Sequence, residues 1–83
     1  MSVRIRLTRI GRKNRPFFRI GAYDSRTRRE GRAIEILGTY DPYIVEDDKK
    51  VVVDADRLRH WISVGARPSE VVSNLIRRSK IQV

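Results

Sequence analysis

Arginines are the residues of this chain whose type and spacing are best suited to chemistry. Arg4 and Arg6 alternate with apolar residues, so on a strand they would project from one face about 6.7 Å apart. Arg19 would extend that face if a neighbouring strand lies in suitable register. Two loops, 11–16 and 24–32, add Arg12, Lys13, Arg15, Arg26, Arg28, Arg29 and Arg32. The planar guanidinium group can donate two hydrogen bonds to a phosphate and can also stack on a base. This pattern therefore predicts nucleic-acid binding.

The charge of the chain is unevenly distributed. The 83 residues carry 19 Lys and Arg against 10 Asp and Glu, for a net charge of +9. Residues 1–32 alone have a net charge of +9, residues 33–66 of −3, and residues 67–83 of +3. A surface that only keeps the protein soluble would intersperse positive and negative charges. The concentration of positive charge in residues 1–32 therefore predicts a face that binds a polyanion. Nucleic acid is the first such partner, and an anionic membrane surface is the second.

Catalytic chemistry is poorly supported by the sequence. The chain has no cysteine and one histidine, His60, which excludes thiolate sites and histidine-pair zinc motifs. We expect His60 to pack in a helix beside Trp61. Ser25 has no general base near it in sequence, and Asp47-Asp48 adjoin two lysines. We therefore expect no enzyme, catalytic residue, cofactor, metal or small-molecule substrate, with a metal-dependent nuclease as a weak alternative.

The residues 1–83 are expected to form one domain whose first half is a sheet. Alternation in 3–8 predicts a half-buried strand, and aromatic and branched residues favour a second strand at 17–23. Further strands are expected at 33–40 and 51–53, with a solvated turn at 46–50 between them. No apolar run exceeds about three residues, so we expect no membrane span.

Helical spacing begins at Asp54, which is suited to be an N-cap, and Gly65 is expected to end that helix in the left-handed conformation. A second helix is expected to begin at Pro68 or Ser69. The predicted apolar stripes are Ala55, Leu58, Trp61 and Ile62, and Val71, Val72, Leu75 and Ile76. The predicted fold class is α+β, a small two-layer domain with about four strands and two C-terminal helices.

Folded RNA suits this chain better than duplex DNA. The two helices superficially resemble a helix-turn-helix, but together they are almost neutral, whereas the cations lie on strands and loops. Tyr23, Phe17 and Tyr40 are expected to pack in the fold rather than to stack on bases. We therefore expect RNA to be recognised through its backbone and shape, and duplex DNA remains the alternative.

Three sequence blocks together resemble one family: V-R-I-R-L-T-R-I-G-R-K-N-R-P-F-F-R-I, then Y-D-S-R-T-R-R-E-G-R-A-I-E-I-L-G-T-Y-D-P, then W-I-S-V-G-A-R-P-S. They are similar to the bacterial-type small-subunit ribosomal protein number sixteen family, in order and spacing. The resemblance implies a structural protein of the small ribosomal subunit, which binds the 5′ domain of its rRNA and supports assembly and translation. It also implies neighbouring ribosomal proteins as partners, in a cytoplasmic ribosome or in an organellar ribosome of bacterial type.

The resemblance also implies roles for individual residues. On the RNA side it places Arg4, Arg6, Arg9, Arg12, Lys13, Arg15, Arg26, Arg29 and Arg32, and it assigns Trp61, Gly65, Pro68 and Ser69 to the fold. This chain departs from the family at Gly21-Ala22, where branched residues are common, so we expect a weaker or curved strand. It also has Arg67 where glutamine is common in the family. This arginine either adds a phosphate contact or has no effect on binding.

Overall fold

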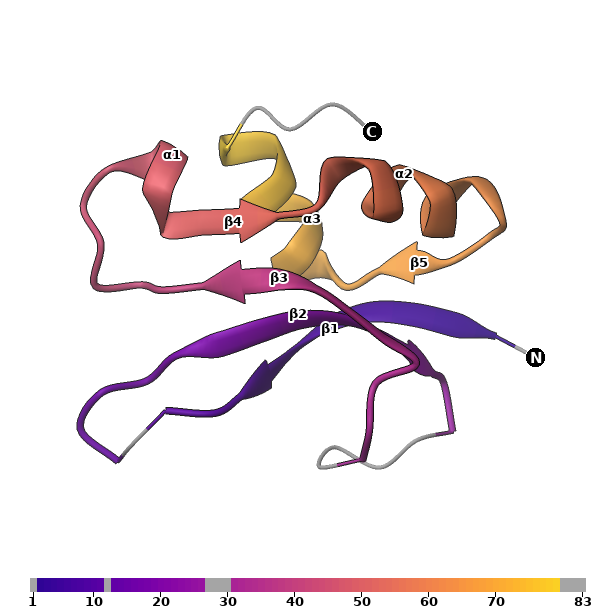
Figure 1. The fold of residues 1–83 in the computed structure, drawn as a ribbon, viewed down its shortest axis with the longest axis horizontal. Helices are drawn as coiled ribbons and strands as arrows, with labels where there is room; N and C mark the ends of the chain where they lie inside the picture. The colour runs from indigo at the N-terminus through magenta and orange to yellow at the C-terminus, as the bar shows by residue number, and fades with distance from the viewer. Residues whose placement is uncertain (1, 12, 27–30, 80–83) are drawn as a thin grey trace.

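The computed structural model describes residues 2–11, 13–26 and 31–79 of the chain. In chain order the elements are β1 (Val3–Arg9), β2 (Phe18–Asp24), β3 (Glu35–Tyr40), α1 (Asp47–Lys50), β4 (Val51–Val53), α2 (Ala55–Ser63), β5 (Arg67–Pro68) and α3 (Glu70–Arg78). The expected α+β class is confirmed, with strands first and the two longer helices last (Figure 1).

The strands form one mixed sheet in the order β4-β3-β2-β1-β5. Neighbours are antiparallel except β5, which pairs with β1 in parallel through Arg4↔Arg67 and Ile5↔Pro68. The four expected strands are present, and β5 is an addition that the sequence did not predict. Two residues are too short to show the period-two pattern that identifies a strand.

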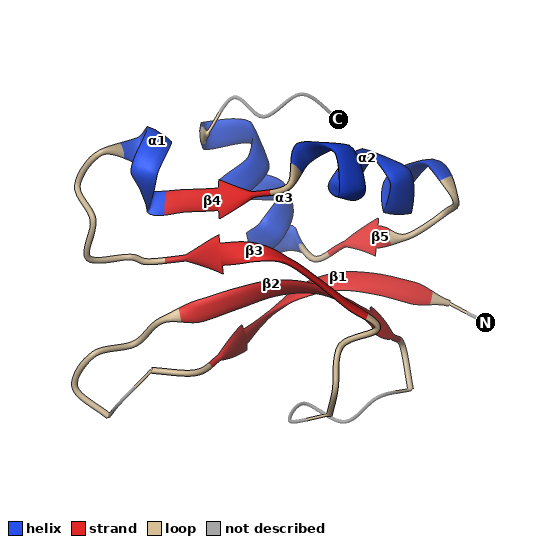
Figure 2. Ribbon diagram, in the orientation of Figure 1, coloured by secondary structure: helices blue, strands red, loops and turns tan. Residues whose placement is uncertain are grey.

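The helices lie on one side of the strands (Figure 2). The core lies between the sheet and the helices. It is formed by Ile5, Ile20, Ala22, Leu37, Val51, Leu58, Ala66, Val72, Leu75 and Ile76. The partly buried Trp61 packs against this cluster, in agreement with its predicted structural role. No helix in the described part of the chain is long and apolar enough to cross a membrane.

A β-bulge bends the centre of the sheet. Ile20 pairs with Gly38 and Gly21 pairs with Ile36, so Leu37 is the extra residue between the two pairs. The irregularity lies beside Gly21, where a curved strand was predicted. Strand alternation buries Leu37 in the core, whereas its neighbour Ile36 is 49% exposed on the other face. A Cβ at Gly38 would meet the Val52 carbonyl oxygen at 2.1 Å, so only glycine allows β4 to approach.

Both long helices begin as their sequences predict, and α2 also ends as predicted. The Asp54 carboxylate accepts a hydrogen bond from the Arg57 backbone N–H at 3.2 Å, and Gly65 has φ of 100° just after α2. Ser69, rather than Pro68, caps α3, because its hydroxyl accepts from the Val72 backbone N–H at 3.3 Å.

Three local predictions were wrong. The expected turn at 46–50 contains the short helix α1, in which the Lys50 N–H donates to the Glu46 carbonyl at 2.9 Å. Val71 is 54% exposed, since the buried residues of α3 are spaced i, i+3, i+4 from Val72 and Val71 lies about 100° away. His60 lies in α2 beside Trp61 as expected, with the two ring centroids 5.6 Å apart in an edge-on contact, but it is exposed rather than partly buried.

Candidate nucleic-acid interface

The sheet has an outer face, which is the side turned away from the helices and which carries Arg4, Arg6, Arg19 and Arg67. Ile5 is fully buried on the helical side, so the alternation of β1 places Arg4 and Arg6 on the outer face. Arg19 is the partner of Thr8, and Arg67 is the partner of Arg4. Cα partners on adjacent strands share a face, so the conditional expectation for Arg19 is confirmed.

Tyr23 forms the base of the outer face beneath Arg6. Tyr23 is 2% exposed, the Arg6 guanidinium carbon lies 3.9 Å from the centroid of its ring, and its hydroxyl is hydrogen-bonded to Thr8 Oγ1. Tyr23 therefore packs in the fold, as expected, although it lies on the side of the sheet away from the helices. A cation–π contact of this kind stabilises the stacked Arg6 geometry by about 0.5–1 kcal/mol at an exposed site.

Arg15 is a predicted site residue whose guanidinium is held closely by a carboxylate. Two of its nitrogens donate to the two oxygens of Asp41, each at 2.7 Å, and its guanidinium carbon lies 4.5 Å from the Tyr43 ring centroid. This hydrogen-bonded pairing lowers the pKa of Asp41 and raises the pKa of Arg15. Arg15 thus ties the β1–β2 loop to the segment after β3, while 50% of its side chain stays exposed.

The structure does not bring all the predicted cations to one surface. Strand alternation places Arg9 on the opposite face from Arg4 and Arg6, and Arg9 Nη2 donates to the Lys13 carbonyl at 3.1 Å. Lys13 itself is exposed in the β1–β2 loop. Arg9 is therefore separated from the outer face, although it is close to Arg4 and Arg6 in the sequence.

The second basic loop is described only at its two ends. Arg26 has 83% of its side chain exposed and pairs loosely with Asp24 at 3.7 Å, while its backbone N–H donates to the same carboxylate at 2.9 Å. Arg32 is exposed and helps Arg19 and Tyr23 to line a hollow of about 420 Å³. The predicted site residues Arg12, Arg28 and Arg29 lie outside the described residues.

Two arginines of α2, on the helical side of the molecule, are paired with carboxylates. Arg57 donates to both oxygens of Glu35 at 2.6 and 2.7 Å, and Arg59 pairs with Asp56 one turn away. The hydrogen bonds from Arg57 lower the pKa of Glu35, and the pKa of Arg57 is raised in turn. Within residues 2–11, 13–26 and 31–79, no three His, Asp or Glu side chains are placed to hold a metal ion.

Comparison with known proteins identifies the family. A family model described as Ribosomal protein S16 matches residues 9–69, which is more than half of the chain. The chain belongs to the ribosomal protein S16 family. The small ribosomal subunit protein bS16 of Rhodopirellula baltica (strain DSM 10527 / NCIMB 13988 / SH1), a member by name, is 53% identical over 78 residues. The alignment covers 94% of this chain and 53% of the relative, so the chain spans about half the length of that curated protein.

Membership of the S16 family confirms the resemblance inferred from the three sequence blocks. The matched region runs through both basic loops and ends at Ser69, the last residue of the third block. S16 proteins are ribosomal proteins, so the expectation that the chain is not an enzyme is also confirmed.

Proposed function

We propose that this S16-family chain is a structural component of the small ribosomal subunit that binds the 5′ domain of small-subunit rRNA. The observation that carries the proposal is its 53% identity, over 94% of its length, to a protein named for that subunit. By binding there it supports subunit assembly and translation in a cytoplasmic ribosome, beside neighbouring small-subunit proteins. It requires no small-molecule substrate, and its polyanionic partner is RNA rather than a membrane.

The outer face supplies the central contacts of this proposal. Arg4, Arg6 and Arg19 stand on adjacent antiparallel strands, so the sheet fixes their spacing before RNA arrives. Each phosphate that they neutralise releases condensed counterions, which favours binding at low salt and lowers the repulsion between converging RNA strands. Because contacts of this kind carry little sequence information, the protein recognises the shape and backbone of folded RNA.

The loop cations extend this surface. The proposed RNA-binding set comprises Arg4, Arg6, Arg9, Arg12, Lys13, Arg15, Arg26, Arg28, Arg29 and Arg32, and the outer face adds Arg19. Arg9 lies on the opposite face of β1, so it would contact RNA apart from the outer face. The exposed side chains of Lys13, Arg26 and Arg32 support their inclusion. Arg15 would contact RNA with the half of its side chain that stays exposed beside Asp41.

Duplex DNA is the second candidate, and no observation favours it. In a helix-turn-helix protein the positive field lies beside the recognition helix. Here Arg57 and Arg59 of α2 are engaged by Glu35 and Asp56, whereas Arg4 and Arg19 on the outer face form no ion pair with a described residue. Arg4 and Arg19 on the sheet are therefore more available to a polyanion than Arg57 and Arg59 of α2.

A competition assay tests the proposal. The full chain is incubated with the isolated 5′-domain RNA against duplex DNA of equal length, over a range of salt concentrations up to about 0.2 M, the range in which electrostatic binding weakens most. We expect the RNA to be preferred at every concentration, including the highest. Equal affinities with equal salt dependence would contradict the proposal, because they would reduce it to general attraction between a cation and a polyanion.

A further inference from the structure

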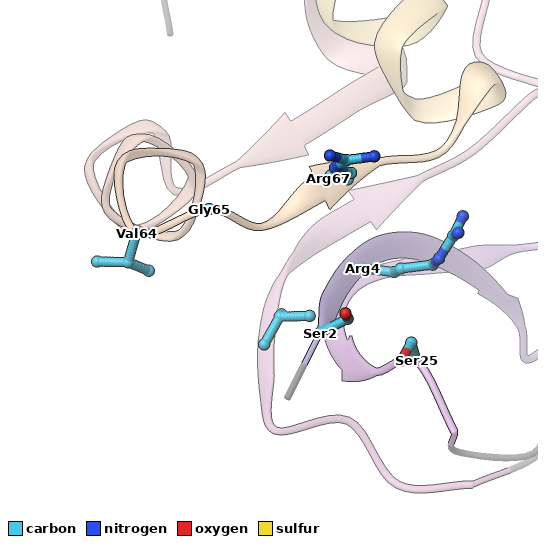
Figure 3. A pocket seen from close by; sticks show the side chains of 7 residues that line it. Ser2, Arg4, Ser25, Val64, Gly65 and Arg67 are labelled. Atoms are coloured by element: carbon cyan, nitrogen blue, oxygen red, sulfur yellow. The ribbon is translucent and has the colours of Figure 1, made fainter.

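We propose that Arg4 and Arg67, with Ser2 and Ser25, form a binding site for one phosphodiester group of the RNA backbone. The inference rests on the proposed function, in that RNA is the ligand, and it adds a defined subsite. The site is a hollow of about 360 Å³ at the β5 edge of the sheet, completed by Val3, Val64 and Gly65 (Figure 3).

The sheet register brings the two arginines together. Arg4 and Arg67 are Cα partners of the parallel β1–β5 pair, so they share the outer face on strands about 4.8 Å apart. Figure 3 shows their side chains leaving neighbouring strands beside the hollow. Like charges directly opposite one another destabilise a strand pair. An anion bound between the two guanidinium groups would reverse that effect.

The described part of the chain provides no such anion. Arg4 and Arg67 are both exposed, and neither forms an ion pair or a hydrogen bond through its side chain with another described residue. By contrast, Arg15 and Arg57 each hold a carboxylate through two short hydrogen bonds. The Arg4–Arg67 pair therefore presents its donors to the solvent, and the guanidinium fork matches two phosphate oxygens.

Two hydroxyl groups add neutral donors to the hollow. The backbone N–H of Ser25 donates to the Ser2 carbonyl at 2.8 Å, which fixes the end of β2 against the start of β1. Neither hydroxyl has a hydrogen-bond partner among the described residues, and both side chains line the hollow. Hydroxyl groups commonly complete phosphate contacts begun by arginine. Ser2 and Ser25 are therefore placed to donate to the same phosphate.

The rim of the hollow favours a polymer over a small ion. Gly65 has no heavy atom within 4 Å of the position that a Cβ would take, so this side stays open to a passing chain. On the other side, Arg4 stands two residues from Arg6 along β1 and on the same face, so the outer face adjoins the hollow. A backbone that crosses Arg6 and Arg19 would reach Arg67 without leaving the sheet.

The first test measures the salt dependence of 5′-domain RNA binding by the full chain. Arg67→Gln keeps a polar side chain and removes the charge, and Arg59→Gln makes the same change on α2, at the Asp56 pair. We expect Arg67→Gln to reduce the slope of log K against log salt by about 0.9, the value for one phosphate contact. Arg59→Gln should leave the slope unchanged. Equal slopes for wild type and Arg67→Gln would overturn the proposal while leaving the RNA assignment intact.

The second test does not depend on rRNA binding. Inorganic phosphate is titrated into the labelled full chain at constant ionic strength, and the amide chemical shifts of Ser25, Gly65 and Arg67 are followed. We expect saturable shifts in wild type and Arg59→Gln, and only linear drift in Arg67→Gln. Absence of saturation in wild type would refute the site. Saturation together with an unchanged RNA slope would refute RNA as its occupant, whereas loss of RNA preference in wild type would instead refute the proposed function.

Discussion

The outer face of the sheet and the helical side both carry arginines, but the partners of these arginines within the fold differ. On the helical side Arg57 and Arg59 each have a carboxylate partner within the fold. On the outer face Arg6 stacks on Tyr23, and Arg4, Arg19 and Arg67 form no ion pair with a described residue. Arginine count alone would not separate the two regions. The difference shows that the location of carboxylates decides which arginines remain available to a polyanion.

The difference also separates the contributions to stability and to binding. The residues that hold the domain together, such as Leu58 and Val72, lie between the sheet and the helices. The outer-face arginines are attached to the same strands yet contribute little to that core. Substitutions on the helical side should therefore change the free energy of unfolding, and substitutions on the outer face should change RNA affinity.

The largest expected effect is on the helical side. Leu58 is fully buried, so Leu58→Ala should lower the free energy of unfolding by about 2–5 kcal/mol. The exposed Val71→Ala is the matched control, with an expected change within about 0.5 kcal/mol. Urea unfolding monitored by circular dichroism measures both. A loss below 1 kcal/mol for Leu58→Ala would show that this side of the sheet does not contain the main core.

On the outer face the expected effect is on binding. Replacing Arg4, Arg6 and Arg19 together by Gln should reduce the salt slope for 5′-domain RNA by up to about 3, at roughly 0.9 per contact. The melting temperature should change only slightly, mainly through loss of the Arg6–Tyr23 contact. Filter binding at several salt concentrations gives the slope. The comparison between the two regions would break if the triple variant melted early and bound with an unchanged slope.

Within the β1–β2 loop, the same contrast between binding and stability can be tested on two neighbouring cations, Lys13 and Arg15. Lys13→Gln should reduce the salt slope by about 0.9 without lowering the melting temperature. Arg15→Gln should lower the melting temperature, because it leaves Asp41 without its bidentate partner. Measuring both quantities for both variants distinguishes them. The reverse pattern would mean that Arg15 is primarily a ligand residue.

The smallest expected effect is an acid dependence of the two bidentate ion pairs. The pKa values of Glu35 and Asp41 are lowered in the folded state by Arg57 and Arg15, so their contribution is present above the unfolded pKa of about 4 and lost as pH falls through the folded values. The variant Glu35→Gln/Asp41→Asn should melt below wild type at neutral pH. This gap should close in acid as wild type loses the two contributions, and a constant gap from about pH 7 to pH 2 would contradict the assignment.

Many of the strands and helix ends that position the candidate interface were predictable from local sequence patterns. The alternation at residues 3–8, the cap at Asp54 and the left-handed Gly65 each depend on a few consecutive residues, and each is confirmed. Family membership was predictable as well, because three blocks in the right order are jointly specific. The exposure of Val71 was not predicted, since neighbouring apolar residues on a short helix compete for one narrow stripe.

The candidate interface was only partly predictable. The basic composition of residues 1–32 indicated a polyanion partner, but charge alone did not show which cations share a surface. Arg19 required the register of β2 against β1, and Arg67 required the two-residue strand β5. The Arg15–Asp41 pair joins residues 26 positions apart, so no local pattern could reveal it.

The sequence by itself determined the family, the α+β class, the helix ends and the sign of the partner's charge. These features follow from short-range periods, capping chemistry and composition, which are complete within a few neighbouring residues. Only the tertiary structure decided that Tyr23 supports Arg6 and that Arg67 stands beside Arg4. Those relations depend on strand register and on where distant carboxylates fall, and both are fixed only when the sheet and its helices pack together.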